Sequence, residues 1–306
     1  MIKTAYLAID YICNERCRFC PCSKDEKKAG IITPFLELKN SIDAFSSNDI
    51  HKLVISGGEP TLHPQLPDII RYAQNSGIEV VLLSNSERFC DPKFLETFLN
   101  IINISMLTVI TTLHSSQKEK HEKANQTPNS FKKTIDGLGY LCDAGVNLIL
   151  KHCITKHNYR DLTEFYNFID DKFPERVSIQ LCSIDYCGIP EDLLAQEMLP
   201  FPNIRSYLEM MFDTHLKRRE QGSKRNLYCI NIPLCSCDVY YWKFMRIPPR
   251  KIYEGYKDPH SSKIIDVSNN VGTFGEACKH CKVFSICNGT YRTAFERFGD
   301  MIVKPY

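Results

Sequence analysis

The chain contains 306 residues, of which 43% are hydrophobic and 24% are charged, and its formal net charge is +2. These proportions are ordinary for a globular protein and exclude long disordered or fibrous regions. The small net charge gives no reason to expect a nucleic-acid or membrane partner. The N-terminus lacks the apolar core and cleavage site of a signal peptide, and no run of about 18 apolar residues occurs, so we expect a cytoplasmic protein.

Short β-branched runs alternate with amphipathic segments through the first 185 residues, which is the pattern of βα units. The expected strands cover residues 4–11, 52–56, 79–84, 106–113, 147–155 and 177–183. The expected helices begin at Thr33 and Pro34 and then cover residues 66–75, 92–100, 130–144 and 159–173. Six units are too few for a complete eight-unit barrel. We therefore predict an α/β fold in which residues 1–190 form a partial (β/α)6 TIM barrel.

The remaining segments are less regular. Residues 115–129 are polar and charged, and we predict a solvated loop there, beside the mouth of the active site. After residue 187 the alternation stops. A helix at residues 204–221 lies in an expected helical linker (191–228), which leads into a small cysteine-rich domain (229–306). The chain has 15 cysteines, and in a cytosolic enzyme of this length cysteines more often bind metal or do redox chemistry than form disulfides.

The first cysteine cluster consists of Cys13, Cys17 and Cys20, in the pattern C-x3-C-x2-C directly after the first strand. Loops at this end of the strands form the active site in parallel βα folds. Three close thiolates can ligate three irons of a 4Fe-4S cluster and leave one iron open for a cofactor. A zinc site or ordinary buried thiols are the alternatives. Cys22 lies near enough to compete as a ligand, but the spacing favours Cys20.

Polar and small residues follow the next strands. The sequence Ser56-Gly57-Gly58-Glu59-Pro60 follows the second strand, and Ser84 and Asn85 end the third. Small residues allow the backbone to approach a ligand closely, and a carboxylate such as that of Glu59 can accept hydrogen bonds from an ammonium group. A plain glycine turn is the alternative. His114 ends the fourth strand and Asn158 follows the fifth, and we expect structural roles for both.

These motifs, in this order, resemble the radical S-adenosylmethionine (SAM) superfamily. Cys13, Cys17, Phe19 and Cys20 match its cluster signature, and Gly57, Gly58 and Glu59 resemble its GGE motif. The resemblance implies that SAM chelates the open iron, that the GGE motif binds the amino group of SAM, and that Ser84 and Asn85 contact its ribose or carboxylate. It also implies reductive cleavage of SAM to a 5'-deoxyadenosyl radical, which abstracts hydrogen from a substrate.

A second cysteine cluster, Cys278, Cys281 and Cys287, has the pattern C-x2-C-x5-C. It resembles the SPASM and shorter twitch extensions of radical SAM enzymes, which carry auxiliary 4Fe-4S clusters. Tyr291 stands where a full SPASM pattern has another cysteine, so we expect one auxiliary cluster. Its fourth ligand is expected to be Cys235, with Cys237 and Cys229 as alternates. A structural zinc site is the alternative, because zinc prefers the same thiolate ligands.

Enzymes with such a tail commonly modify ribosomally made peptides by thioether formation, carbon–carbon crosslinking or epimerisation, and the resemblance implies this substrate class first. Because the first strand begins within about ten residues of the N-terminus, leader recognition is expected on the barrel, on the tail or through a separate protein. The expected electron donor is a flavodoxin or ferredoxin, and the auxiliary cluster is expected to accept an electron. The alternatives are oxidation of a small molecule such as an aminosugar alcohol, and a non-catalytic iron–sulfur or zinc protein.

Thiols can also donate a hydrogen atom to a substrate radical. Cys182 and Cys187 lie near the end of the sixth strand, where we expect them to face the mouth, so they are our candidate hydrogen donors. The alternative is that they are ordinary buried thiols, since free cysteine is a common buried residue. Cys90, Cys142 and Cys153 are expected to be core or surface thiols.

Overall fold

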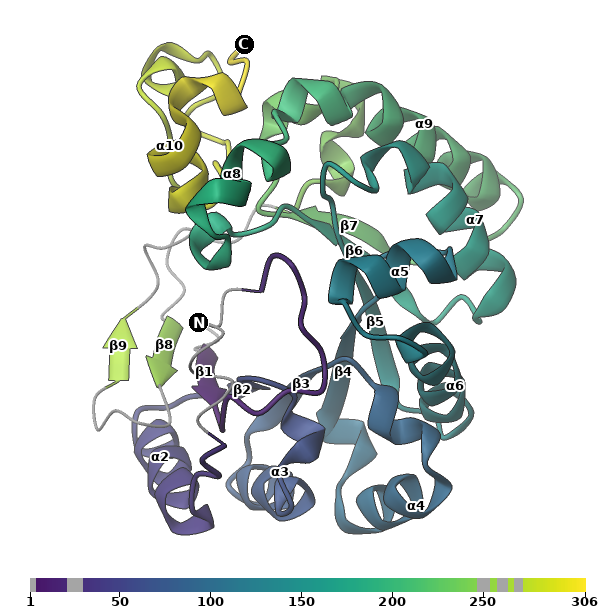
Figure 1. The fold of residues 1–306 in the computed structure, drawn as a ribbon, viewed down its shortest axis with the longest axis vertical. Coiled ribbons are helices and arrows are strands. Elements are labelled where there is room, and N and C mark those ends of the chain that lie inside the picture. Colours follow the sequence, from purple (N-terminus) through teal and green to yellow (C-terminus); the bar gives the residue numbers. More distant parts are fainter. Residues whose placement is uncertain (1–3, 21–29, 247–253, 258–263, 267–271) are drawn as a thin grey trace.

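The computed structural model describes residues 4–20, 30–246, 254–257, 264–266 and 272–306. These residues form an α/β fold around one open sheet of nine strands in the order β7-β6-β5-β4-β3-β2-β1-β8-β9 (Figure 1). All neighbours from β7 to β8 are parallel, whereas β8 and β9 are antiparallel. The predicted partial TIM barrel with a cysteine-rich C-terminal region is therefore confirmed.

The six predicted strands are all present, and half of their twelve ends differ from the prediction, by one to three residues. They are β1 (Thr4–Ala8), β2 (Lys52–Ser56), β3 (Glu79–Ser84), β4 (Leu107–Thr112), β5 (Asn147–Cys153) and β6 (Ser178–Cys182). Three further strands were not expected: β7 (Leu227–Ile230), β8 (Glu254–Lys257) and β9 (Ile264–Asp266). Each has at most four residues, which is too short for a periodic pattern to stand out in the sequence.

Helices cover the outer face of the sheet (Figure 1). The helices along this face include α2 (Phe35–Ser47), α3 (Leu66–Asn75), α4 (Pro92–Ile101), α6 (Ser130–Asp143) and α7 (Leu162–Lys172). The others are α5 (Lys118–Asn125), which contacts the first cysteine loop, and α8 (Glu191–Glu197), α9 (Phe201–Glu220) and α10 (Arg292–Phe298). Helix α9 packs on α7 and precedes β7, which joins the sheet beside β6. The boundary expected at residues 228/229 therefore falls inside β7.

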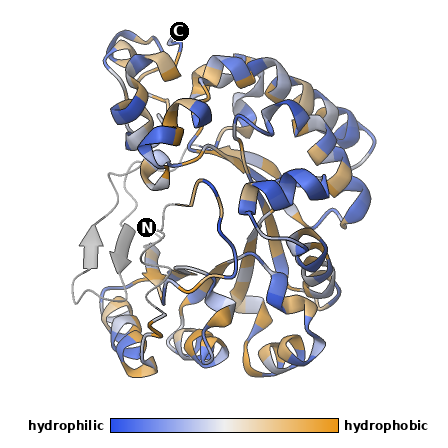
Figure 2. Ribbon diagram, viewed as in Figure 1, coloured by the Kyte–Doolittle hydropathy of each residue, from blue (hydrophilic) through white to orange (hydrophobic). Residues whose placement is uncertain are grey.

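The alternation of side chains along each strand separates the core from the pocket. On β5, Leu148 and Leu150 are fully buried, and alternation places them on one face of the strand, whereas Lys151 and Cys153 lie on the other. Figure 2 shows hydrophobic strands at the centre and hydrophilic residues on the outer helices. The core therefore lies between the sheet and the helices, and the inner face of the sheet is left for the site. Within the described part of the chain, no helix is both long and apolar enough to span a membrane.

The prediction of a solvated loop at residues 115–129 was wrong. Residues 118–125 form helix α5, and two of its side chains, His121 and Asn125, are fully buried. These two residues are four apart and therefore share one face of the helix. This segment is polar, so it has no apolar pattern that would indicate a buried helix face. Hydrogen bonds to the first cysteine loop hold the helix in place instead.

Candidate functional site

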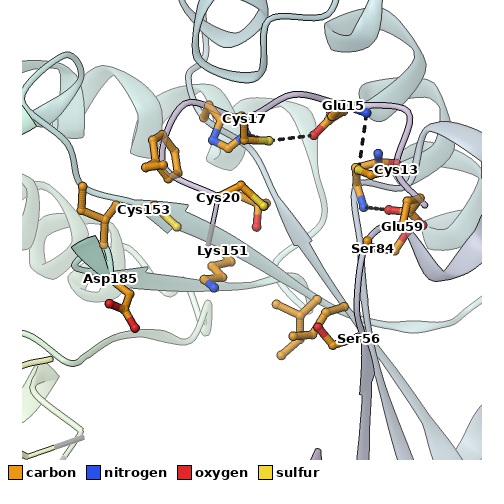
Figure 3. A pocket seen from close by; sticks show the side chains of 18 of the residues that line it. Cys13, Glu15, Cys17, Cys20, Ser56, Glu59, Ser84, Lys151, Cys153 and Asp185 are labelled. Carbon is orange, nitrogen blue, oxygen red and sulfur yellow. Dashed lines mark hydrogen bonds between the residues drawn. The ribbon is translucent and has the colours of Figure 1, made fainter. Parts of the chain in front are cut away.

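The main pocket, with a cavity volume of about 230 Å³, opens at the C-terminal ends of the strands. Side chains from the loop after β1 and from the ends of β2 to β6 line it, together with one residue of the C-terminal region. Figure 3 shows Cys13, Glu59 and Ser84 grouped on one side of this pocket and Lys151, Cys153 and Asp185 on the other. The sequence thus folds its motifs into one cavity.

The three cysteines Cys13, Cys17 and Cys20 all line this pocket. Helix α5 holds their loop in place, because the N–H groups of Arg16 and Arg18 donate hydrogen bonds to its last turn, at 2.9 and 3.0 Å. Soft thiolates on one side of a cavity fit three irons of an iron–sulfur cluster. Cys22, the competing ligand, lies outside the described residues.

Glu15 and Asn125 support the cysteine loop and were not found by sequence reasoning. Asn125 Nδ2 donates to Glu15 Oε1 at 2.7 Å, and Cys17 Sγ donates to Glu15 Oε2 at 3.3 Å. Burial raises the pKa of Glu15 to about 7. Glu15, Cys17 and His114 bring their ligand atoms within 4.8 Å of one another, which is close enough for a metal ion. A mononuclear zinc ion is the alternative occupant of this corner.

Gly57 and Gly58 bring the end of β2 against the first cysteine loop. Gly58 N–H donates to Asp10 O at 2.8 Å, and Glu59 N–H donates to Ile12 O at 2.7 Å. A Cβ atom at Gly57 would lie 2.0 Å from Asp10 O, and one at Gly58 would lie 2.1 Å from Ile12 O. The two glycines therefore allow β2 to approach the backbone of the cysteine loop. From the sequence, we expected them to allow close approach to a ligand instead.

The carboxylate of Glu59 is buried at the centre of a network of donors. Its Oε1 accepts hydrogen bonds from Thr61 N (3.0 Å), Thr61 Oγ1 (2.6 Å) and Ser84 Oγ (2.7 Å), and its Oε2 accepts one from Asn85 N at 2.7 Å. Burial raises the pKa of Glu59, and these donors oppose that shift. Because a carboxylate oxygen has two lone pairs, Oε2 can accept one more donor. The residue pair Ser84 and Asn85, predicted from the sequence, orients this carboxylate.

His114 and Asn158 have different surroundings. His114 lines the pocket with its Nε2 3.8 Å from Cys17 Sγ and its ring edge-on to Phe19, and burial lowers its pKa well below the usual value. Asn158 instead ties strand ends together, because its Nδ2 donates to His114 O and Cys153 O at 3.1 and 2.9 Å. Its contacts are those of a structural residue.

The far side of the pocket holds Lys151, Cys153, Asp185 and Tyr291, none of which was predicted to belong to it. Tyr291 comes from the C-terminal region, where the sequence identified it only as a departure from a cysteine pattern. Lys151 and Cys153 alternate at the end of β5, which is the signal that could have identified them. Burial raises the pKa of Tyr291, and the nearby sulfurs of Cys153 and Cys182 raise that of Lys151.

Neither expected hydrogen donor lines this pocket. Cys182 is fully buried with its Sγ 3.5 Å from Cys153 Sγ, and Cys187 is exposed on the turn Tyr186–Gly188. The strand β6 ends at Cys182, so the chain has turned away before Cys187. Cys153, expected to be a core or surface thiol, is the cysteine of this group that lines the pocket.

The second cysteine group encloses a small cavity in the C-terminal region. Cys235, Cys278, Cys281 and Cys287 all line it, and its walls are largely apolar. The N–H groups of Leu234 and Gly289 point to Cys287 Sγ at 3.5 and 3.4 Å. The alternates lie elsewhere: Cys237 is fully buried outside this cavity and Cys229 lies within β7. Four thiols around one cavity fit a 4Fe-4S cluster, and they also fit zinc.

Comparisons with known proteins identify the family. A family model described as "Radical SAM superfamily" matches residues 9–169. The chain is 21% identical over 248 residues to "Fe-coproporphyrin III synthase" of Methanosarcina barkeri, a match that covers 80% of this chain and 59% of that protein. The chain spans about half the length of the curated relatives it matches.

Solved structures extend the likeness of fold to the C-terminal region. SuiB of Streptococcus suis, in a crystal structure bound to S-adenosylmethionine, superposes with a TM-score of 0.68 at 12% identity, over 99% of this chain and 76% of SuiB. The structure titled "Native anSMEcpe with bound AdoMet" also has a TM-score of 0.68, at 15% identity, over 99% of this chain and 93% of that one. At such low identity these likenesses concern the fold.

Proposed function

This chain belongs to the radical SAM superfamily, and we propose that it is an enzyme that cleaves SAM reductively and abstracts a hydrogen atom from a ribosomally synthesised peptide. The observation that carries this proposal is that three cysteines and the buried Glu59 line one pocket, with Cys13 beside Glu59 (Figure 3). When a 4Fe-4S cluster and SAM are bound there, they supply a 5'-deoxyadenosyl radical.

The residues of the pocket divide the binding task. Cys13, Cys17 and Cys20 would hold three irons, and Glu59 Oε2 would accept a hydrogen bond from the amino group of SAM. Ser84 and Asn85 already orient Glu59, so the carboxylate is positioned before the ligand arrives. Such preorganisation would fix the position of SAM, and with it the carbon that accepts the hydrogen atom.

The four cysteines of the C-terminal cavity would hold an auxiliary 4Fe-4S cluster. With Cys235, Cys278, Cys281 and Cys287 as ligands, each iron has a protein thiolate and no iron is left open. A role as electron acceptor is therefore preferred to direct binding of substrate. The low polarity of the cavity walls supports a closed site, which also suits a structural zinc ion.

The peptide class is supported by the fold. SuiB has also been solved bound to its precursor peptide SuiA, and that structure superposes over 99% of this chain with a TM-score of 0.68. We propose that a separate protein or the surface of this chain recognises the leader, and that a flavodoxin or ferredoxin supplies electrons. Among the described residues, the pocket lining contains no feature that selects a peptide sequence.

Oxidation or modification of a small molecule is the second candidate. It is favoured by the relative named Fe-coproporphyrin III synthase, whose similarity covers 80% of this chain, and by the Lys151 ammonium, which could bind an anionic group in the pocket. Mass spectrometry of cells with and without the protein separates the two candidates. A mass change among peptides supports the first, and a mass change among small molecules supports the second.

The decisive first experiment is anaerobic iron and sulfide quantitation on reconstituted wild type and on Cys13→Ala/Cys17→Ala/Cys20→Ala, with dithionite-driven formation of 5'-deoxyadenosine. We expect about eight irons in the wild type and about four in the variant, with the nucleoside formed only by the wild type. Cys90→Ala is the matched control and should behave like the wild type. A folded, reconstituted wild type without iron–sulfur signal or nucleoside would contradict the proposal and favour a non-catalytic zinc protein.

A further inference from the structure

Two thiols lie together at the edge of the pocket. Cys153 and Cys182 are register partners on the neighbouring parallel strands β5 and β6. Their sulfur atoms are 3.5 Å apart, with Cys182 donating to Cys153. Cys153 lines the pocket whereas Cys182, only 1% exposed, lies next to it outside the lining. Cys153 is therefore placed to contact a molecule in the pocket, whereas Cys182 contacts Cys153 without lining the pocket.

A cation accompanies this thiol pair. Lys151 is two residues before Cys153 on β5, so the two side chains share one face of the strand, and both line the pocket. Lys151 forms no ion pair with a carboxylate among the residues that the structure describes. The S–H···S hydrogen bond, and after it the charge of Lys151, lower the pKa of Cys153, whereas the same bond and burial raise the pKa of Cys182. The pair is thus suited to share one proton between two sulfurs.

We propose that Cys153 and Cys182 form a catalytic dithiol that returns a hydrogen atom to the substrate radical. This inference rests on the proposed function, and it narrows the product class to those in which the radical carbon regains hydrogen, such as epimerised residues. The structure thereby assigns to Cys153 the role that the sequence suggested for Cys182 and Cys187.

The step balances as follows for the singly protonated pair. The hydrogen bond between the sulfurs starts with the proton on Cys182, so that proton first moves along the bond to Cys153. The Cys153 S–H bond then breaks, the hydrogen atom forms a C–H bond at the substrate radical, and a sulfur radical remains. That radical joins the Cys182 thiolate as a disulfide radical anion. Loss of one electron, which the cluster proposed for the C-terminal cavity would accept in its oxidised state, leaves a Cys153–Cys182 disulfide. A dithiol reductant then supplies two electrons and two protons, and release of one proton restores the singly protonated pair.

The surroundings favour this sequence of events. The sulfurs need no large movement to combine, because they already lie at hydrogen-bond distance. The Lys151 ammonium offsets the negative charge that the pair carries before and after the transfer. Cys142 offers a contrast within the same chain, because it is buried in helix α6 and does not line the pocket.

The test uses SAM alone as the probe, with reconstituted protein and dithionite in D2O. The shared proton exchanges with solvent, so we expect deuterium from Cys153 to appear in 5'-deoxyadenosine in the absence of substrate. In Cys153→Ala and Cys153→Ser the deuterated fraction of the 5'-deoxyadenosine that is formed should fall at least about fivefold. Cys142→Ala should match the wild type. An unchanged deuterated fraction in both Cys153 variants would overturn the inference.

A second measurement does not depend on turnover. Anaerobic oxidation with diamide followed by peptide mapping should yield a Cys153–Cys182 disulfide in the wild type and none in Cys182→Ala. Absence of that crosslink from the wild type would exclude the proposed role of Cys182. If the wild type forms no 5'-deoxyadenosine at all, the proposed function itself fails, and the inference fails with it. If the wild type forms the nucleoside and the Cys153 variants leave its deuterated fraction unchanged, only the inference fails.

Discussion

Glu59 is the residue on which the pocket is organised, because a buried carboxylate is unfavourable unless donors satisfy it. The contacts from Thr61, Ser84 and Asn85 provide that compensation and leave one lone pair of Oε2 available. The carboxylate is therefore held ready for a cationic group. The surrounding protein, more than the ligand, fixes where that cation will lie.

Glu59→Gln tests this arrangement. The amide cannot offer a charged acceptor to the amino group of SAM, and hydrogen bonds to charged groups contribute about 1.5–3 kcal/mol, so we expect SAM affinity to fall by about 10- to 100-fold. Anaerobic titration calorimetry on reconstituted protein measures the change. Glu79→Gln, at the exposed N-terminal start of β3, is the control and should bind SAM normally. Equal affinities of the two variants would argue against a role for Glu59 in SAM binding.

His215 gives a prediction on pH. Burial lowers its pKa to about 4 against an ordinary value of 6.5, and its Nδ1 lies 3.1 Å from the hydroxyl of Tyr166. Because the unfolded chain takes up the proton first, stability is complete above pH 6.5 and is lost as the pH falls from 6.5 to about 4, by up to about 3 kcal/mol from this residue.

The check is urea unfolding of wild type, His215→Gln and the exposed His51→Gln between pH 7.5 and 4.5. His215→Gln should show a shallower loss of stability towards acid than the wild type, even though it is less stable at neutral pH. His51→Gln should follow the wild type. Parallel pH profiles for wild type and His215→Gln would exclude this histidine as a source of acid sensitivity.

At the scale of elements, a helix or strand could be predicted where its residues form a recognisable hydrophobic pattern. Strands β2 and β3 match residue for residue, because apolar β-branched runs end sharply at polar or small residues. Helix α5 was missed because its stability depends on tertiary hydrogen bonds, which leave no apolar periodicity in the sequence. The Asn125 side chain donates to Glu15, and N–H groups of the cysteine loop donate to carbonyls of the helix. Strand β7 was missed because four residues are too few for a pattern.

Helix α6 contains a matched pair of glycines that tests how closely it packs. A Cβ atom at Gly137 would lie 2.2 Å from Ser86 O, in the turn that follows Asn85, whereas one at Gly139 would meet nothing within 4 Å. Gly137→Ala should therefore destabilise the protein by roughly 2–3 kcal/mol through backbone displacement. Gly139→Ala should stabilise it by about 0.5–1 kcal/mol, because alanine loses less conformational entropy in a helix.

Urea unfolding at pH 7.5 measures both glycine variants. Because Gly137 contacts the turn beside Ser84 and Asn85, the displaced helix should also weaken SAM binding in Gly137→Ala and not in Gly139→Ala. Two variants of equal stability would mean that α6 does not pack on this turn as tightly as the structure indicates.

At the scale of the whole molecule, the C-terminal region completes the pocket. Tyr291 lines the cavity from a segment that follows the second cysteine group by four residues. Thr290 Oγ1 donates to Asn231 O at 2.9 Å and so ties this segment to the end of β7. The sequence located both cysteine groups, but it did not reveal this connection, because chain folding alone brings residues 13 to 20 and 291 to one cavity. A change at the second group should therefore be felt in the first pocket.

Cys278→Ala/Cys281→Ala tests that dependence. Loss of two of four proposed ligands should reduce the iron content of reconstituted protein from about eight to about four. Because metal binding can supply folding free energy to its ligand segment, limited proteolysis should also cleave the region after residue 272 faster. SAM should still bind, but Tyr291 would no longer be held in the pocket. Solvent access to Cys153 should therefore rise, which its rate of alkylation measures.

The control is Cys187→Ala, because Cys187 is exposed and lies outside both cavities. Unchanged iron with one zinc lost per chain would instead identify the second group as a structural zinc site.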